Sequence, residues 1–282
     1  MSAAPTGFWE PASAAGIPHF GLGTYGRTGA DGLAALRFAL DIGYRHFDTA
    51  QTYGTEANVG RAVRESGLPR KDVFITTKIA DNNLGGGRVT ATLRESLKTI
   101  GVEQVDLTLI HWPSYRDEAP MASYLTELLQ AKRAGLTRLI GVSNFTVALL
   151  ARAADLIGAQ EIATNQVEVH PYLQNRTLRA FSDGLGVVTT AYMPLARGAV
   201  ASDPVFIRIA ERHGCTAAAV SLGWLVSKGM VVIPASGKRE HLRSNLGAAP
   251  VKLTLEESAQ IDALDRGRRM IDPPKKAPDW DR

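Results

Sequence analysis

The chain has 282 residues, 45% of them hydrophobic and 21% charged, and a formal net charge of +4. These values are ordinary for a globular protein, and the basic residues are too dispersed to favour nucleic-acid binding. The first twenty residues lack a signal-peptide pattern, no run is apolar enough to span a membrane, and a single cysteine excludes an internal disulfide. We therefore expect a cytoplasmic protein.

Short apolar runs rich in β-branched residues recur roughly every 25 to 40 residues along the chain. Most are apolar at consecutive positions, as in strands that are buried on both faces of a parallel sheet. We predict strands at 19–24, 45–50, 73–79, 105–112, 138–145, 163–170, 187–194 and 231–236.

Amphipathic segments separate these strands, and most end at a glycine, which is typical of a helix C-terminus. The segment at 146–158 begins at Thr146, a good N-cap. The stretch around Cys215 also favours a helix, in which we expect a buried, unreactive thiol. We predict helices at 31–43, 56–67, 87–101, 120–135, 146–158, 175–186, 204–214, 216–229 and 253–265.

Strands that alternate with helices indicate a parallel sheet, and no change in composition divides the chain. Eight such units in a chain of this length predict an α/β fold with a single (β/α)8 TIM barrel over residues 1–282. A doubly wound open sheet is the alternative. The charged, proline-rich tail at about 266–282 is expected to wrap the barrel as an extended segment.

The motif at 21–26 matches the G-x-G-x-x-G fingerprint of dinucleotide-binding open sheets. That fingerprint requires its third glycine to open a helix, whereas Gly26 is followed by a helix-breaking stretch and the next helix begins near Asp31. No acidic residue ends a strand about 20 residues further on. We interpret the motif as a glycine-rich first loop.

Four polar residues occupy the ends of three successive predicted strands. Asp48, Lys78 and His111 each end a strand, and Tyr53 lies in the loop after Asp48. In a β/α barrel, polar side chains at the carboxyl ends of strands face one pocket. The four residues are therefore expected to meet in a single site.

These residue types are suited to carbonyl reduction. Tyr53 can donate a proton, and a nearby Lys78 ammonium favours the phenolate and lowers the tyrosine pKa. Asp48 can pair with Lys78, and His111 can hydrogen-bond the carbonyl oxygen where negative charge develops. The hydride must come from a cofactor, because no side chain donates one.

Each residue also has a plainer explanation. Tyr53 can be an ordinary loop tyrosine, Asp48 and Lys78 a structural salt bridge, and His111 a hydrogen-bonded core histidine. A slow-turnover regulatory module that senses a cofactor, or a sugar-phosphate isomerase or lyase on a barrel, are the alternative functions. The sequence lacks an acyl-transfer serine elbow, a zinc-binding histidine motif and a nucleotide triphosphate loop, so we expect no metal site.

The motifs that surround these residues resemble those of the aldo-keto reductases, in the same order and over nearly the whole chain. Within that family the chain is most similar to the bacterial 2,5-diketo-D-gluconate reductases of the B type, which also reduce methylglyoxal. The matching motifs are GLGTYG (21–26), GYRHFDTAQTYGTEANVG (43–60), FITTKI (74–79), VDLTLIHWP (105–113), IGVSNF (140–145), TNQVEVHPYLQN (164–175), YMPLARG (192–198) and VIPASGKREHLRSN (232–245).

The resemblance implies a role for each matching position. The catalytic tetrad falls on Asp48, Tyr53, Lys78 and His111, and Asp48 also falls among the cofactor-binding positions. The nicotinamide carboxamide is held by Ser143, Asn144 and Gln166, and its ring stacks on Tyr192. The remaining cofactor positions are Gly23 and Thr24 in the first loop, Leu195 to Gly198 over the pyrophosphate, and Ser236, Lys238, Arg239, His241 and Asn245 at the adenosine end.

Several positions depart from the family pattern. At the adenosine end, Ala235, His241 and Ser244 stand where the family usually has Lys, Arg and Glu, so the phosphate-binding charge is expected from Lys238 and Arg239. Ala80 replaces a common aromatic and should open one wall of the substrate pocket, and Met193 replaces the usual serine after Tyr192.

The sequence thus predicts a monomeric reductase that uses NADPH, with some NADH use conceivable, and acts on aldehydes, α-dicarbonyls or keto-sugar acids. The substrate walls are predicted at Tyr25, Trp112, His170 and Trp280.

Overall fold

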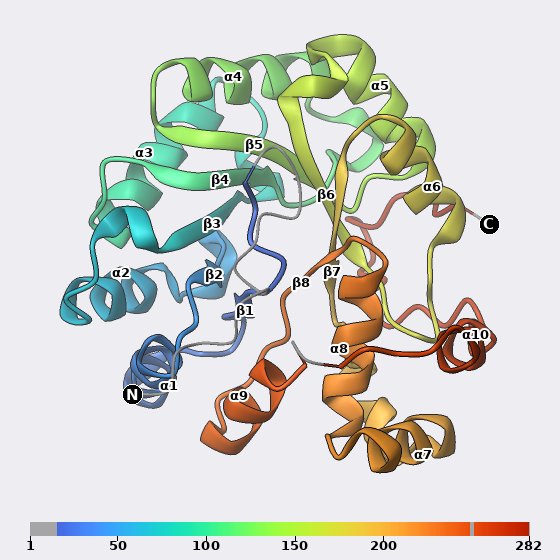
Figure 1. The fold of residues 1–282 in the computed structure, drawn as a ribbon. Helices are drawn as coiled ribbons and strands as arrows, with labels where there is room; N and C mark the ends of the chain where they lie inside the picture. The colour runs from blue at the N-terminus through green and yellow to red at the C-terminus, as the bar shows by residue number, and fades with distance from the viewer. Residues whose placement is uncertain (1–15, 249–250, 282) are drawn as a thin grey trace.

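The computed structural model describes residues 16–248 and 251–281, whose strands form one eight-stranded parallel sheet in the order β1 to β8 (Figure 1). A parallel bridge between Phe20 and Val232 joins the two ends of the sheet, and the Gly21 amide donates to the Val232 carbonyl at 2.8 Å. The predicted barrel is confirmed. Its strands are β1 Leu22–Gly23, β2 His46–Asp48, β3 Phe74–Ile79, β4 Val105–Ile110, β5 Thr137–Ser143, β6 Ile162–Glu168, β7 Val188–Tyr192 and β8 Val231–Val232.

Helices cover the outside of the barrel, and all except α9 follow predicted segments closely, whereas no helix was predicted where α9 lies (Figure 1). They are α1 Gly29–Asp41, α2 Glu56–Glu65, α3 Arg88–Ile100, α4 Met121–Arg133, α5 Val147–Ile157, α6 Arg176–Gly184, α7 Pro204–His213, α8 Ala217–Ser227, α9 Arg239–Leu246 and α10 Leu255–Asp262. No helix among the described residues is long and apolar enough to cross a membrane.

Two local predictions need correction. The run at 231–236 is strand only at Val231 and Val232, because Pro234 has no N–H with which to continue the ladder. Cys215 lies between α7 and α8 rather than in a helix, and it is partly exposed. Gly214 ends α7 with a left-handed φ of 58°, which turns the chain just before the thiol.

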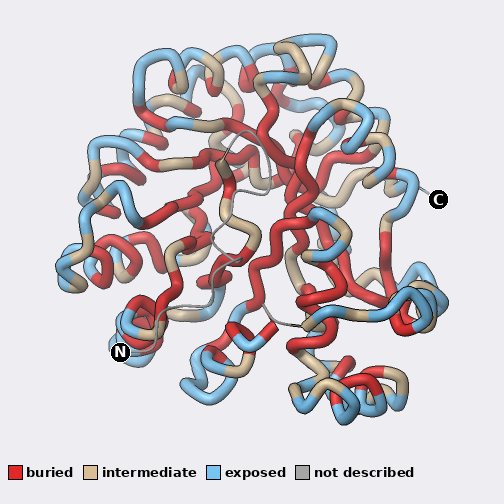
Figure 2. The backbone as a smooth tube through the Cα atoms, in the orientation of Figure 1, coloured by how far each residue is buried: buried red, intermediate tan, exposed pale blue. Residues whose placement is uncertain are grey.

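The side chains that point into the barrel change character along each strand. On β3, Phe74 belongs to the apolar cluster inside the barrel, Thr76 follows it, and Lys78 lies at the carboxyl end. Leu107 and Leu109 precede His111 in the same way along β4. Buried residues line the strands throughout, while exposed ones lie on the outer helices (Figure 2). An apolar plug therefore fills one end of the barrel, and polar groups fill the other.

The tail after α10 contains neither helix nor strand. The amides of Met270 and Ile271 donate to the Glu168 carboxylate at 2.8 and 2.9 Å, which fixes the tail to the carboxyl end of β6. Further along, Asp281 accepts from the Val147 amide at 2.9 Å and caps the N-terminus of α5. These contacts hold the tail across the end of the barrel that carries the polar groups.

A substitution at Gly60 tests how closely α2 packs against the end of α3. It lies inside α2, where an added Cβ would come within 1.7 Å of the Ile100 carbonyl oxygen. Gly60→Ala is expected to lower the free energy of unfolding by about 1 to 3 kcal/mol, because backbone must move. Urea unfolding measures the change.

Gly184, in α6, is the matched control, since no atom lies within 4 Å of its added Cβ. Gly184→Ala should stabilise by about 0.5 to 1 kcal/mol, the difference in helix propensity. Equal effects of the two substitutions would show that α2 does not pack on Ile100 as described.

Candidate active site

The structure brings the four predicted catalytic residues together at the carboxyl end of the barrel. Lys78 forms an ion pair with Asp48, donates to the Thr49 carbonyl at 3.0 Å, and lies 3.5 Å from the Tyr53 hydroxyl. That hydroxyl is 3.3 Å from Nε2 of His111. The tyrosine oxygen thus lies between an ammonium and an imidazole.

Asp48 contacts both Lys78 and Gln166 through its carboxylate. One of its carboxylate oxygens pairs with Lys78, and the other accepts from the Gln166 amide at 2.8 Å. Lys78 is fully buried and Asp48 is 2% exposed, so neither charge is screened by water. Burying an unpaired ammonium is very costly, and the paired carboxylate is what makes this position tolerable.

Burial and charge set the protonation states. Burial lowers the pKa of Lys78 by itself, but Asp48 and Tyr53 outweigh it, and the pKa of Lys78 is raised. Burial raises the pKa of Tyr53, and the Lys78 ammonium opposes that shift without reversing it. Lys78 thus acts in the predicted direction, but the expectation of a lowered tyrosine pKa is not met. Tyr53 is therefore a protonated phenol at neutral pH.

His111 is neutral. Burial, with the positive charges of Lys78 and Lys276, lowers its pKa to about 3. A neutral imidazole has one N–H donor and one acceptor nitrogen, so His111 can orient an oxygen by hydrogen bonding without adding a charge.

The predicted carboxamide-binding residues form one hydrogen-bonded network beside the tetrad. Ser143 donates to the Gln166 carbonyl at 2.8 Å, and Asn144 donates to the His111 carbonyl at 2.9 Å. The Tyr192 hydroxyl donates to the Asn144 side-chain oxygen at 2.8 Å. Asn144 has a left-handed φ of 63°, a strained conformation that persists where surrounding contacts enforce it. The network ties β5, β6 and β7 to the catalytic histidine.

Three of the four predicted substrate-wall residues surround the tetrad. Tyr25 is 70% exposed and packs edge-on against Tyr53 at 5.2 Å between ring centroids. Trp112 and Trp280 pack edge-on at 6.2 Å, which places the tail beside the strand end that carries His111.

The fourth, His170, has no exposed surface with which to contact a substrate. Its Nε2 is 2.8 Å from the Glu168 carboxylate that also binds the tail amides. His170 therefore supports the attachment of the tail instead of forming a wall. Glu168 had no distinguishing signal in the sequence, because the tail amides that it binds lie about 100 residues away.

The predicted adenosine-end residues lie around the loop after β8 and the start of α9. Ser236 is buried and accepts from the Lys238 amide at 3.2 Å. The Arg239 guanidinium packs on the Phe38 ring at 4.7 Å, while His241 is exposed. Asn245 is buried against Tyr44. Gly23 ends β1 and Thr24 begins the loop that follows it, and both are buried. The turn at 195–198 includes Gly198 with a φ of 88°.

Arg27 belongs to this end of the site, although the sequence analysis missed it. A Cβ added to Gly237 would lie 2.6 Å from its Nη1, so the guanidinium rests directly against the loop between Ser236 and Lys238. Its Nε is buried and has no hydrogen-bond partner among the described residues. Only the fold could reveal this cation, because 210 residues separate Arg27 from Gly237 in sequence.

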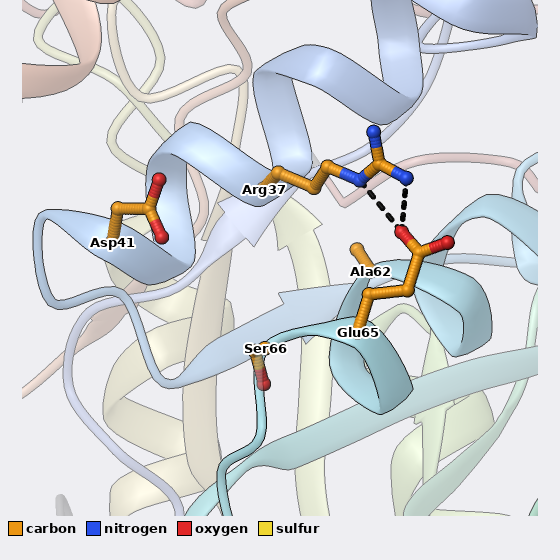
Figure 3. A pocket seen from close by; sticks show the side chains of 5 residues that line it. All are labelled: Arg37, Asp41, Ala62, Glu65 and Ser66. Carbon is orange, nitrogen blue, oxygen red and sulfur yellow. Dashed lines mark hydrogen bonds and ion pairs between the residues drawn. The ribbon is translucent and has the colours of Figure 1, made fainter.

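A separate hollow of about 300 Å³ lies between α1 and α2, lined by Arg37, Asp41, Ala62, Glu65 and Ser66 (Figure 3). Arg37 and Glu65 form an ion pair there. It is on the outer helical layer and contains none of the site residues. Within the described residues, no group of three or more His, Cys, Asp or Glu side chains is placed to hold a metal ion.

The Asp48–Lys78 pair predicts a measurable asymmetry in stability. Lys78→Met leaves a buried carboxylate unpaired and is expected to cost about 3 to 5 kcal/mol in the free energy of unfolding. Adding Asp48→Asn should recover a large part of that loss, because no buried charge remains. Urea unfolding of the three variants checks this. Lys98→Met, on the exposed face of α3, is the control. Additive losses in the double variant would contradict the pairing.

Comparison with known proteins agrees with this geometry. The chain is 47% identical over 265 residues to the methylglyoxal reductase DkgB of Escherichia coli O157:H7, covering 94% of this chain and 99% of that protein. A solved structure assigned as a 2,5-diketo-D-gluconic acid reductase B is 40% identical, with a TM-score of 0.93 over 98% of both chains. The aldo-keto reductase AKR2E5, solved in complex with NADPH, is 30% identical, with a TM-score of 0.87 over 93% of this chain and 89% of that one.

The family model described as Aldo/keto reductase family matches residues 16–266, which include every predicted catalytic and cofactor position discussed above. The chain belongs to the aldo/keto reductase family.

Proposed function

We propose that this protein, as a monomer, uses NADPH to reduce the carbonyl group of small aldehydes, α-dicarbonyls or keto-sugar acids to an alcohol. The observation that carries the proposal is the position of the Tyr53 hydroxyl, 3.5 Å from the Lys78 ammonium and 3.3 Å from His111 Nε2. A carbonyl oxygen placed between the phenol and the imidazole would meet two hydrogen-bonding groups as it gains negative charge.

Each residue of the tetrad has a distinct task in this chemistry. The nicotinamide cofactor supplies the hydride when it is bound. Neutral His111 orients the carbonyl oxygen, and Tyr53 gives that oxygen its proton. Lys78 stabilises the phenolate that Tyr53 leaves behind, and Asp48 holds Lys78 in place. The burial of Asp48 and Lys78 keeps water from weakening these interactions.

The adenosine end has features that suit a 2′-phosphate. Arg27 has a buried Nε without a partner, and its guanidinium lies against Gly237 between Ser236 and Lys238. Among the described residues, neither Arg27 nor Lys238 forms an ion pair with a carboxylate, so their charge is available to an anion. Arg239 packs on Phe38 and is exposed, so a guanidinium that suits phosphate binding lies at the surface beside this loop. We infer that Arg27 supplies the charge that the family arginine gives at position 241.

The names of the relatives support the substrate range. Methylglyoxal is an α-dicarbonyl and 2,5-diketo-D-gluconate is a keto-sugar acid, and both names occur among the similar proteins. The neighbour solved with NADPH supports the cofactor.

Tyr53→Phe tests the reaction. Removing the phenolic oxygen should lower turnover by about 10² to 10⁴-fold, because the proton donor is lost, while NADPH binding stays close to wild type. NADPH absorbance measures turnover with methylglyoxal, an aromatic aldehyde and a keto-sugar acid, and fluorescence titration measures NADPH binding. Turnover near the wild-type rate would refute Tyr53 as the acid, and no turnover of any carbonyl by the wild type would refute the proposed function.

The cofactor assignment has its own test. Arg27→Ala and the double variant Lys238→Ala, Arg239→Ala should each raise the NADPH dissociation constant by about tenfold or more, because each removes a hydrogen-bonded charge partner of the phosphate. The NADH dissociation constant should change little, since NADH has no 2′-phosphate. Fluorescence titration gives both constants without turnover. Equal weakening of NADPH and NADH binding would show that these cations do not bind the 2′-phosphate.

A further inference from the structure

A tight turn in the tail points two adjacent lysines in different directions. The amides of Lys276 and Ala277 both donate to the Pro273 carbonyl, at 3.3 and 3.0 Å. Lys275 has a left-handed φ of 63° and is exposed, whereas Lys276 is partly buried and forms an ion pair with Asp81 at 2.9 Å. The turn therefore directs the Lys276 ammonium towards the barrel and leaves Lys275 in solvent.

The ion pair places Lys276 next to the strand ends that carry the catalytic residues. Asp81 follows β3 by two residues, and the His111 amide donates to the Ile79 carbonyl at 3.1 Å. Asp81 and His111 thus extend from the ends of neighbouring strands. The loop that holds Asp81 is fixed by Gln51, whose side-chain oxygen accepts from the Ala80 amide at 2.9 Å. Lys276 is near enough to interact electrostatically with His111, because its positive charge contributes to lowering the pKa of that imidazole.

The ion pair is not what keeps the tail in place. Glu168 binds the amides of Met270 and Ile271, Trp280 packs on Trp112, and Asp281 caps α5. These contacts hold the tail on both sides of the turn. A partly exposed ion pair contributes little to the stability of the fold, so stability does not account for a lysine and an aspartate at these two positions.

Lys276 also borders open space. A cleft of about 530 Å³ lies between the tail and the loop after β4, and its lining includes Pro113, Ser114, Lys276 and Ala277. The lining contains no residue of the tetrad, and Pro113, two residues beyond His111, is the lining residue nearest to the tetrad in sequence. Ala80, with its small buried side chain, adds no bulk at the neighbouring strand end. A substrate held by its carbonyl at His111 would have room to extend towards the ammonium.

We propose that Lys276, which pairs with Asp81, binds the carboxylate of the substrate and gives the enzyme a preference for carbonyl compounds that carry an acidic group. This inference rests on the proposed function, because it concerns the far end of the same substrate. It identifies keto acids and aldehyde acids as the favoured class. Lys276 is a specificity residue in this scheme, since it acts at the distal end of the substrate and leaves the reacting carbonyl to the tetrad.

The test uses two substrates with the same reacting aldehyde, succinic semialdehyde, which carries a carboxylate, and its uncharged methyl ester. Lys276→Gln should lower the ratio of kcat/KM for the acid to that for the ester by about tenfold, chiefly through KM of the acid. Lys275→Gln is the matched control and should leave the ratio unchanged, because Lys275 is exposed. Added salt should raise KM of the acid in the wild type more than in Lys276→Gln.

Asp81→Asn separates substrate recognition from a structural role. If Lys276 binds the carboxylate, removing its neutralising partner should keep or increase the preference for the acid. If the pair only holds the tail, Asp81→Asn and Lys276→Gln should lower kcat/KM for acid and ester alike. That result, or an unchanged ratio in Lys276→Gln, would overturn the inference while wild-type methylglyoxal turnover still upheld the proposed function. Absence of all turnover in the wild type would refute both.

Discussion

The buried ion pair between Asp48 and Lys78 is the interaction on which the site depends. A fully buried ammonium is tolerated only with a carboxylate beside it, and here the carboxylate is itself fixed by Gln166. The three groups come from β2, β3 and β6, so they meet only when the sheet closes into a barrel. The same ammonium then lies 3.5 Å from the Tyr53 hydroxyl, where it would stabilise a phenolate.

A second buried carboxylate organises the rim of the site. Glu168 ends β6, two residues after Gln166, and accepts from His170 and from two amides of the tail. One strand therefore supports the catalytic ion pair through Gln166 and the tail through Glu168. Because the tail also carries Trp280 and Lys276, the positions of these two side chains depend on the strand that holds Gln166.

The strand-end residues were predictable because they are polar or charged residues at the ends of apolar strands. A lysine that closes an apolar strand needs a partner, and Asp48 ends the preceding predicted strand. The carboxyl ends of parallel strands share one end of a barrel, so Tyr53 and His111 could be placed with them. The roles of Ser143, Asn144 and Tyr192 came from family resemblance. The network that joins them to the His111 carbonyl required the structure.

Residues whose partners are distant in sequence could not be found in advance. Arg27 lies against Gly237, Glu168 binds the tail, and Lys276 pairs with Asp81 across 195 residues. His170 has the residue type of a pocket wall, but it is buried, and its Nε2 lies 2.8 Å from the Glu168 carboxylate. The sequence determined the alternation of strands and helices and the polar residues at the strand ends, since these follow from local periodicity. Tertiary structure decided which side chains became neighbours, and through burial it decided their protonation. Tyr53 keeps its proton and His111 is neutral, because the closed barrel shields both side chains from much of the solvent.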